Sequence, residues 1–236
     1  MKEYIFNQII LTILFVSVFN CHAQSNTNGI ILNKTRVIIV NDTDSLSIKN
    51  NSDDTYLIKS DILTGPEIND KKNDSMIISP PLLKIKGNET KTIKLWKKKH
   101  HVSDREDIAY LSVLAIPSTP ESYINNDYVS VGLRSVIKVF IRPTSLPEPS
   151  HHSVCSLNFE KTMNKQVTAT NTTAYFITIS EIIVNDDKNI LDRPVMIYPF
   201  GNVKINIAPE IQKIKWRYIN DYGIHSKYCD TRIKNN

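Results

Sequence analysis

The chain is poor in the residues that several common classes of protein need. Glycine accounts for only 6 of its 236 residues, which disfavours both glycine-rich phosphate loops and a collagen-like repeat. Three cysteines are too few for a disulfide scaffold, and from Gly29 onward no stretch of twelve residues carries an amphipathic helical stripe. The excess of positive charge, +5, is small and spread along the chain, so nucleic-acid binding has no support.

The N-terminus has the pattern of a signal peptide. Its uncharged run at residues 9–19 is shorter than the roughly 20 residues of a membrane span. Cys21 and Ala23 are small residues at the two positions that a signal peptidase reads, so we predict cleavage after Ala23 and export of the protein. One alternative is a lipoprotein anchored at Cys21, which bulky Phe19 and polar Asn20 disfavour. The other is a buried N-terminal helix.

Beyond residue 29 the apolar residues recur with a period of two. Short runs rich in β-branched and aromatic residues are separated by Asn- and Asp-rich turn clusters. Many short strands at such spacing indicate an all-β fold, and two sandwiches of roughly 100 residues fit the chain better than one. The predicted strands cover residues 37–40, 46–49, 56–58, 76–78, 82–85, 92–96, 110–116, 128–141, 166–170, 175–183, 203–207 and 214–219.

A proline-rich segment divides the chain. Residues 143–150 contain three prolines, and because proline donates no backbone hydrogen bond, the segment indicates a stiff linker. Cys155 and Cys229 both follow it, and two cysteines in an oxidising compartment most simply form one disulfide, which we expect to join the first and last strands of their domain. The predicted organisation is a signal peptide at 1–23, a first domain at 24–142, the linker at 143–150 and a second domain at 151–236.

The segment from Tyr128 to Arg142 is long for a strand, whose usual length is about 5–6 residues. Val129, Val131 and Leu133 form one apolar row in its first half. A long, regular edge with such a row invites pairing with another chain, and it also allows self-association of the free protein. The other interpretation is an ordinary half-buried strand of a sandwich.

Seven short motifs follow one another along both predicted domains. They are Asn33-Lys34-Thr35-Arg36-Val37, Tyr56-Leu57-Ile58-Lys59-Ser60, Ser79-Pro80-Pro81-Leu82 before Gly87-Asn88, Asp104-Arg105-Glu106 leading to Tyr110 and Ile116-Pro117, Ile137-Lys138-Val139-Phe140-Ile141-Arg142-Pro143, Asn171-Thr172-Thr173-Ala174-Tyr175-Phe176-Ile177-Thr178, and Ile219-Asn220-Asp221-Tyr222-Gly223. In this order they resemble the periplasmic pilus (fimbrial) assembly chaperones of the chaperone–usher pathway, the PapD-like family.

The resemblance implies two immunoglobulin-like sandwiches arranged as a boomerang around a cleft. It implies a periplasmic chaperone that donates its long edge strand to pilus subunits, each lacking one strand, and delivers them to an outer-membrane usher. Arg36 and Lys138 would bind the subunit's terminal carboxylate, and Val129, Val131 and Leu133 would be the donor side chains. Lys138 lies an odd number of residues after each donor residue, so in a regular strand its side chain points to the opposite face. We therefore expect a bulge or twist between the donor residues and Lys138 if Lys138 is to enter the cleft.

The resemblance also implies an interdomain ion network of Glu106, Arg142 and Asp221, in which one guanidinium bridges two carboxylates. This role is structural. The segment 118–136, which connects Ile116-Pro117 to Ile137, is slightly longer than we expect for the short-loop subclass of the family. The cysteine pair that usually marks the long-loop subclass is absent, so we favour the short-loop subclass.

No catalytic constellation stands out, so we expect no enzyme activity and no cofactor. His100-His101 and His151-His152 suggest metal ligands, with Cys155 near the second pair, but adjacent histidines on a strand point to opposite faces, so we expect no metal site. The alternative function is that of a secreted adhesin or structural fimbrial protein. The linker disfavours it, because a pilus subunit would be one incomplete domain.

Overall fold

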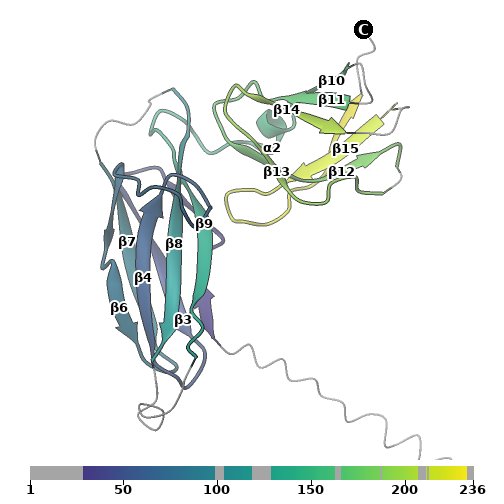
Figure 1. Ribbon diagram of the computed structural model, residues 1–236. Coiled ribbons are helices and arrows are strands. Elements are labelled where there is room, and N and C mark those ends of the chain that lie inside the picture. Colours follow the sequence, from purple (N-terminus) through teal and green to yellow (C-terminus); the bar gives the residue numbers. More distant parts are fainter. Residues whose placement is uncertain are drawn as a thin grey trace, which may run out of the picture.

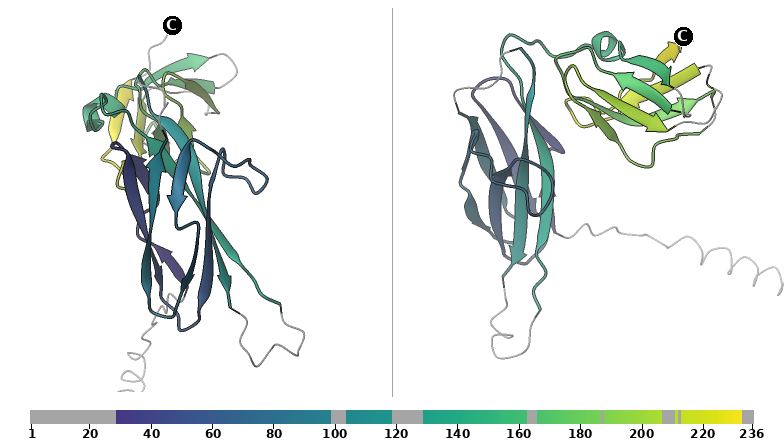
Figure 2. Two further views of the ribbon diagram at one scale, coloured as in Figure 1. Left: turned by 90° about the vertical axis from the view of Figure 1, so that its left-hand side faces the viewer. Right: turned by 45° about the horizontal axis from the view of Figure 1, so that its top comes forward.

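The protein consists of two β-sandwiches that meet at one end and lie at a wide angle to each other (Figure 1; Figure 2). The computed structural model describes residues 29–98, 104–118, 129–162, 166–186, 188–206, 211 and 213–232. The predicted all-β fold with two sandwich domains is confirmed. The predicted signal peptide and His100-His101 lie outside the described residues. No helix among those residues is long and apolar enough to cross a membrane.

The first sandwich packs a five-stranded sheet on a four-stranded sheet. Alternating side chains of both sheets point inward, and Ile39, Leu46, Ile93 and Leu111 are completely buried between them. The strand order of the larger sheet is β2 (Arg36–Ile39), β9 (Leu133–Ile141), β8 (Asp107–Pro117), β4 (Tyr56–Leu63) and β6 (Leu82–Ile85). The smaller sheet has the order β1 (Ile30–Leu32), β3 (Thr43–Asn50), β7 (Thr90–Lys97) and β5 (Met76–Ser79).

The second sandwich is built around Trp216, which is fully buried and lies against Phe159, with 5.8 Å between the ring centroids. A short helix, α2 (His151–Val154), precedes its strands. One sheet has the order β10 (Asn158–Thr162), β11 (Gln166–Thr170) and β14 (Asn202–Asn206). The other has the order β13 (Val195–Ile197), β12 (Ile177–Val184), β15 (Lys213–Tyr218) and β16 (Cys229–Arg232).

A disulfide joins Cys155 to Cys229 across 74 residues of sequence. The pairing of the two cysteines agrees with the prediction, but the element that carries Cys155 differs from the one that we expected. Cys155 caps the C-terminus of α2 and lies ahead of β10, so the bridge ties the end of a helix, not a first strand, to β16. The helix escaped prediction because four residues are too few to show a helical period in the sequence.

Strand β9 is shorter than predicted. It begins at Leu133, opposite Ala115 of β8, whereas Val129 and Val131 lie outside any described strand. Of the bulge or twist that we expected between the donor residues and Lys138, the bulge is wrong, because the pairing of β8 with β9 runs without a shift over Leu133–Ile141. No bulge is needed, because Lys138 reaches the outer face of the sheet by ordinary alternation along the strand.

The same buried asparagine corner stabilises both sandwiches. Asn50 and Asn171 are each fully buried. The amide of Asn171 donates to the carbonyls of Tyr175 and Tyr198 at 2.7 and 2.9 Å, and its oxygen accepts the N–H and hydroxyl of Thr173. Asn50 repeats this pattern, donating to two carbonyls at 2.6 and 2.9 Å and accepting both groups of a serine two residues on. Each side chain therefore satisfies backbone groups that water cannot reach.

We predict that Asn171→Ala lowers the free energy of unfolding by about 2–3 kcal/mol, because it leaves buried carbonyls and an N–H without partners. Urea unfolding of the disulfide-bonded protein measures the change. Thr172→Ala is the control, since Thr172 is exposed, and it should change the stability by less than about 0.5 kcal/mol. Equal stabilities of the two variants would contradict the role assigned to the corner.

Candidate functional site

The outer face of the five-stranded sheet meets the second sandwich at the end where β2 and β9 pair. The pairing is parallel and places Arg36 directly opposite Lys138. Val37 and Val139, the next residues of the two strands, point into the core and are fully buried. The alternation of each strand therefore sends both cations to the same outer face, where they stand side by side.

Neither cation forms an ion pair with a carboxylate within the described part of the chain. Arg36 donates from Nη1 to the carbonyl of Ile219 at 3.1 Å, and its guanidinium carbon lies 5.5 Å from the centre of the Phe140 ring. Its Nε is buried and makes no hydrogen bond there. Lys138 forms no ion pair or hydrogen bond with a described residue. The site therefore offers two half-buried positive charges and unused donors to an anion.

Burial lowers the pKa of both side chains. For Lys138, loss of solvation is the main cause and the charge of Arg36 adds to it. For Arg36, loss of solvation also dominates, and the charges of Asp221 and Glu106 only partly oppose it. Two like charges held together in this way repel each other, and a bound carboxylate removes that cost.

One guanidinium joins the two sandwiches. Arg142, the residue after β9, donates from Nε to Glu106 at 2.8 Å and from Nη1 and Nη2 to Asp221 at 2.7 and 3.0 Å. Glu106 belongs to the first sandwich and also accepts the N–H of Phe176 from the second at 2.8 Å. Although burial opposes the charged form of Arg142, the bonds and charges of the two carboxylates raise its pKa. The network therefore links the two sandwiches through one side chain.

The turn that carries Asp221 lies directly against β2. Gly223 has φ +78°, and a Cβ there would overlap Oγ1 of Thr35, so this position requires glycine for both its conformation and its space. Asn220 shapes the turn by accepting the N–H groups of Tyr222 and Ile224 at 3.1 and 3.2 Å. The turn thereby brings Asp221 to Arg142 from the second domain.

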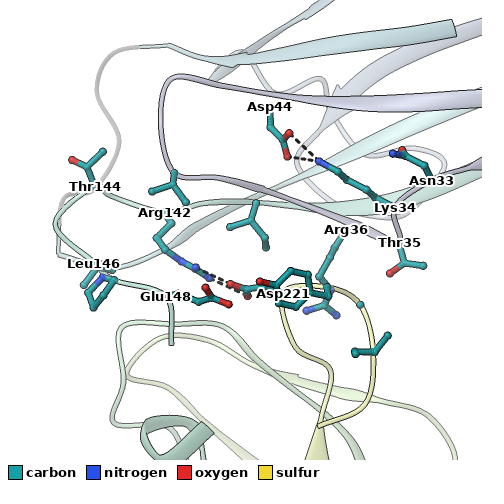
Figure 3. Close-up of a pocket in the computed structure, with 16 residues that line it drawn as sticks. Asn33, Lys34, Thr35, Arg36, Asp44, Arg142, Thr144, Leu146, Glu148 and Asp221 are labelled. Carbon is teal, nitrogen blue, oxygen red and sulfur yellow. Dashed lines mark hydrogen bonds and ion pairs between the residues drawn. The ribbon is translucent and has the colours of Figure 1, made fainter. Parts of the chain in front are cut away.

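A cavity of about 840 Å³ opens between β2, the linker and this turn. Figure 3 shows its wall, where Arg142 points to Asp221 and Lys34 points to Asp44. Lys34 and Asp44 form an ion pair of 2.8 Å, and Ile38 and Leu146 add apolar surface. Arg36 lines this cavity as well as a smaller one of about 140 Å³ at the domain junction. The guanidinium is therefore reachable from the space between the domains.

The proposed donor residues are exposed. Val129, Val131 and Leu133 have 84%, 77% and 63% of their surface accessible, which contradicts the alternative of a half-buried core strand for this row. Beside them, the outer edge of β9 is open, because β2 pairs only with Lys138–Ile141 and no other described strand pairs with that edge. The open edge therefore ends at the two cations.

The structure adds aromatic residues that the sequence did not single out. The rings of Phe140 and Phe176 lie 5.5 Å apart, and those of Phe176 and Tyr198 lie 5.1 Å apart, so a chain of rings runs from the floor of the cleft into the second domain. Phe140 lies on the outer face between the core residues Val139 and Ile141, so in the sequence it is only one member of an apolar run, and Tyr198 comes from a loop.

The adjacent histidines at 151 and 152 lie in α2 and not on a strand. His151 is brought close to Cys155 and Cys229, whereas His152 is exposed and belongs to no described group of metal-ligand side chains. The argument from strand geometry was therefore wrong for this pair, because α2 places the two histidines on a helix.

Comparison with known proteins identifies the family. Residues 29–147 match "Pili and flagellar-assembly chaperone, PapD N-terminal domain", and residues 153–230 match "Pili assembly chaperone PapD, C-terminal domain". The chaperone protein CssC of Escherichia coli is 30% identical over 217 residues, covering 88% of this chain and 92% of its own. The chaperone protein FimC of Escherichia coli strain K12 is 29% identical over 201 residues, covering 83% and 80%.

Solved structures share the fold. The periplasmic chaperone SfaE is 27% identical with a TM-score of 0.71, and the match covers 87% of this chain and all of that one, 100%. A chain from the complex of SafA pilin with the SafB chaperone of Salmonella enterica has a TM-score of 0.76 at 20% identity, covering 88% of this chain and 98% of that one. The second likeness supports the architecture only.

We predict that Arg142→Ala lowers the free energy of unfolding by about 3–5 kcal/mol, because Glu106 is left as an uncompensated buried charge. The free energy of unfolding of Arg142→Lys should lie between those of the wild type and Arg142→Ala, since lysine keeps the charge but cannot form the bidentate hydrogen bonds of a guanidinium. Urea unfolding measures both, with exposed Arg193→Ala as the matched control. A loss below about 1 kcal/mol for Arg142→Ala would mean that the network is no more than a surface ion pair.

We also predict that Lys138→Met stabilises the free protein at neutral pH. The fold holds the pKa of Lys138 below the 10.5 of an ordinary lysine, so the folded state pays a cost for keeping this side chain charged. That cost is complete below the pKa of the folded state, and it is lost as the pH rises from that pKa to the pKa of the unfolded state. The advantage of the variant should therefore shrink as the pH approaches 10.5. Urea unfolding of the wild type and the variant at neutral pH and near pH 10.5 tests this prediction, with Lys94→Met at an exposed position as the control. Destabilisation at neutral pH would contradict the prediction.

Proposed function

The chain belongs to the PapD family of pili assembly chaperones, and we propose that it captures pilus subunits in the periplasm and delivers them to an outer-membrane usher. Capture occurs by strand donation from β9, with the subunit's terminal carboxylate bound at Arg36 and Lys138. The observation that carries the proposal is the pair of adjacent, half-buried cations, neither of which forms an ion pair with a described residue. The process needs neither ATP nor a cofactor.

A carboxylate satisfies the chemistry of the cation pair better than any group of the described chain. Arginine offers a planar fork and lysine a compact point charge, so the two together bind a carboxylate with charge-assisted hydrogen bonds. The polar contacts that Arg36 already makes keep its side chain oriented, while its remaining donors stay available. Because the site is half-buried, the interaction is screened less than on an open surface.

The geometry of β2 indicates how a subunit strand lies. β2 runs parallel to β9 and occupies its outer edge only from Lys138 onward. A subunit strand that ends with its carboxylate at Arg36 and Lys138 continues that line along the free part of the edge, and it must also run parallel to β9. Main-chain bonds then supply affinity, and the side chains of Val131 and Leu133 enter the gap in the subunit.

The anchor and the donors work together through register. Lys138 and Leu133 lie on opposite faces of a strand without a bulge, so a slip of one residue turns every donor away from the subunit. A fixed carboxylate excludes such a slip. The Arg142 network contributes by holding the second domain, and with it Ile219, against Arg36. The family favours this function over that of an adhesin, and no observation on the structure supports the latter.

For location, we predict a mature protein that begins at Gln24 and accumulates in the periplasm. N-terminal sequencing of protein released by osmotic shock checks this. Retention of residues 1–23 or recovery in the outer-membrane fraction would contradict it, and the second outcome would favour the lipoprotein alternative.

The anchor prediction is that Arg36→Ala and Lys138→Ala each abolish or severely weaken capture of a subunit. Each loses a charge-assisted contact worth about 1.5–3 kcal/mol and also the register that this contact fixes. Lys138→Arg should restore capture only in part. Pull-down of a tagged subunit from periplasm measures the effect, and exposed Lys94→Ala on the opposite sheet is the matched control. Full capture by both alanine variants would refute the mechanism.

The donor prediction is that Val131→Asp or Leu133→Asp prevents capture while the free protein still folds, because both side chains are exposed in the free state. A carboxylate placed in an apolar gap costs several kcal/mol unless it is neutralised. Ile77→Asp, at an exposed apolar site of the other sheet, is the control for an added charge. Unfolding of the free donor variants would instead assign these residues to the core.

A further inference from the structure

A second cluster of reactive side chains lies at the start of the second sandwich. His151, Cys155 and Cys229 each offer a ligand atom, and these atoms all lie within 4.8 Å of one another. We propose that this cluster binds one Zn²⁺ ion in the protein whose two thiols are still reduced, and that formation of the disulfide closes the site. The proposal does not depend on the chaperone function.

Helix α2 presents two of the ligands on one side. His151 and Cys155 are four residues apart, so one helical turn stacks them. Ser150 caps the helix by accepting the N–H of Ser153 at 3.1 Å, which fixes that turn. Nε2 of His151 lies 3.4 Å from Sγ of Cys155. Neighbouring nitrogen and sulfur ligands of tetrahedral zinc are separated by roughly 3.5 Å, given bonds of about 2.0–2.1 and 2.3 Å, so this pair needs little movement.

A tyrosine orients the imidazole. Nδ1 of His151 lies 3.2 Å from the hydroxyl of Tyr218, and the two rings stack with an interplanar angle of 25°. With Nε2 bound to a metal, Nδ1–H donates to this hydroxyl, which takes the place of the carboxylate, carbonyl or water that usually accepts from a metal-bound histidine. The third ligand, Cys229, comes from β16, and its Cα lies 5.4 Å from that of Cys155, so rotation of the two side chains separates the thiolates around an ion.

The surroundings suit a transient site. Cys229 is buried, Cys155 is half-buried and His151 is exposed, so an ion enters from solvent and keeps a water molecule as its fourth ligand. Two thiolates and one imidazole form a ligand set that zinc prefers over magnesium or calcium. The period in which both sulfurs are available rests on the proposed export, because an exported chain reaches the oxidising compartment before its disulfide forms.

Metal binding and disulfide formation exclude each other. In oxidation by a disulfide-bonded oxidant, such as oxidised glutathione or a dithiol oxidoreductase, the thiolate of Cys155 attacks one sulfur of the oxidant and expels a thiolate. The thiolate of Cys229 then attacks the mixed disulfide and expels the second thiolate. The two cysteines lose two electrons and the oxidant gains them. Zinc leaves, because neither sulfur remains a thiolate, and while bound it slows the first attack.

The test measures zinc binding to the mature protein before and after reduction with a phosphine, using a chromophoric chelator as competitor. We expect one Zn²⁺ per reduced chain and none per oxidised chain. His151→Ala should weaken binding at least about tenfold, whereas His152→Ala, which removes the neighbouring exposed imidazole, should bind as the wild type does. Cobalt substituted for zinc should show a thiolate-to-metal charge-transfer band in the wild type only while the protein is reduced.

Two further measurements keep the test decisive if reduction loosens the domain. Zinc should raise the melting temperature of the reduced wild type and of His152→Ala, but not that of His151→Ala. Zinc should also slow reoxidation by oxidised glutathione in the first two proteins only. No binding by the reduced protein, or the same affinity in both histidine variants, would overturn the proposal.

Discussion

The parallel pairing of β2 with β9 is the constraint on which the functional site depends. It places Arg36 opposite Lys138 and gives both strands the same alternation, so two cations reach one face while their neighbours fill the core. A fold gains nothing in stability from two adjacent half-buried cations, and the lowered pKa of Lys138 reflects that cost. The arrangement makes physical sense when an anion arrives from outside, which is the role that we propose for the subunit's carboxylate.

The second constraint is the position of the second sandwich. Arg142 follows β9 directly, so the strand that carries Lys138 and Leu133 also carries the residue that binds Asp221 across the domain junction. The turn with Gly223 then packs against Thr35, one residue before Arg36. Both walls of the cleft are thereby attached to the two strands that hold the cations. One asparagine corner lies within each sandwich and the disulfide lies within the second, whereas the Arg142 network joins the two sandwiches.

Much of the architecture could be predicted from the sequence because sandwich strands carry a clear period of two. The edge of β9 shows where this fails, since the apolar row from Val129 to Leu133 continues the pattern, but the partner strand β8 pairs only up to Leu133. Pairing is a property of two strands and is not visible in one. The helix α2 and short strands such as β1 and β16 were not predicted, because three or four residues contain too little periodic signal.

The candidate site was predicted in outline through motifs, while its geometry was not. Nothing in the spacing of Arg36 and Lys138 reveals a parallel pair, and the bulge expected from their parity with the donors does not exist. The predicted disulfide brings Cys229 near the segment that contains His151, but the approach of the imidazole to both sulfurs depends on helix α2, which was not predicted. Apart from the disulfide, the contacts between residues far apart in sequence that shape the site had to come from the structure or from the family resemblance.

The central claim is that a terminal carboxylate is the ligand of the cation pair. The most direct measurement compares, by calorimetry, the affinity of the protein for a peptide of a subunit's last strand with a free carboxylate and for the same peptide ending in an amide. The account predicts that the amide binds at least about tenfold more weakly, as expected when a charge-assisted contact of about 1.5–3 kcal/mol is lost. It also predicts that this difference shrinks in Arg36→Ala and in Lys138→Ala, since each variant loses one of the two cations. Equal affinities for the two peptides in the wild type would contradict the account.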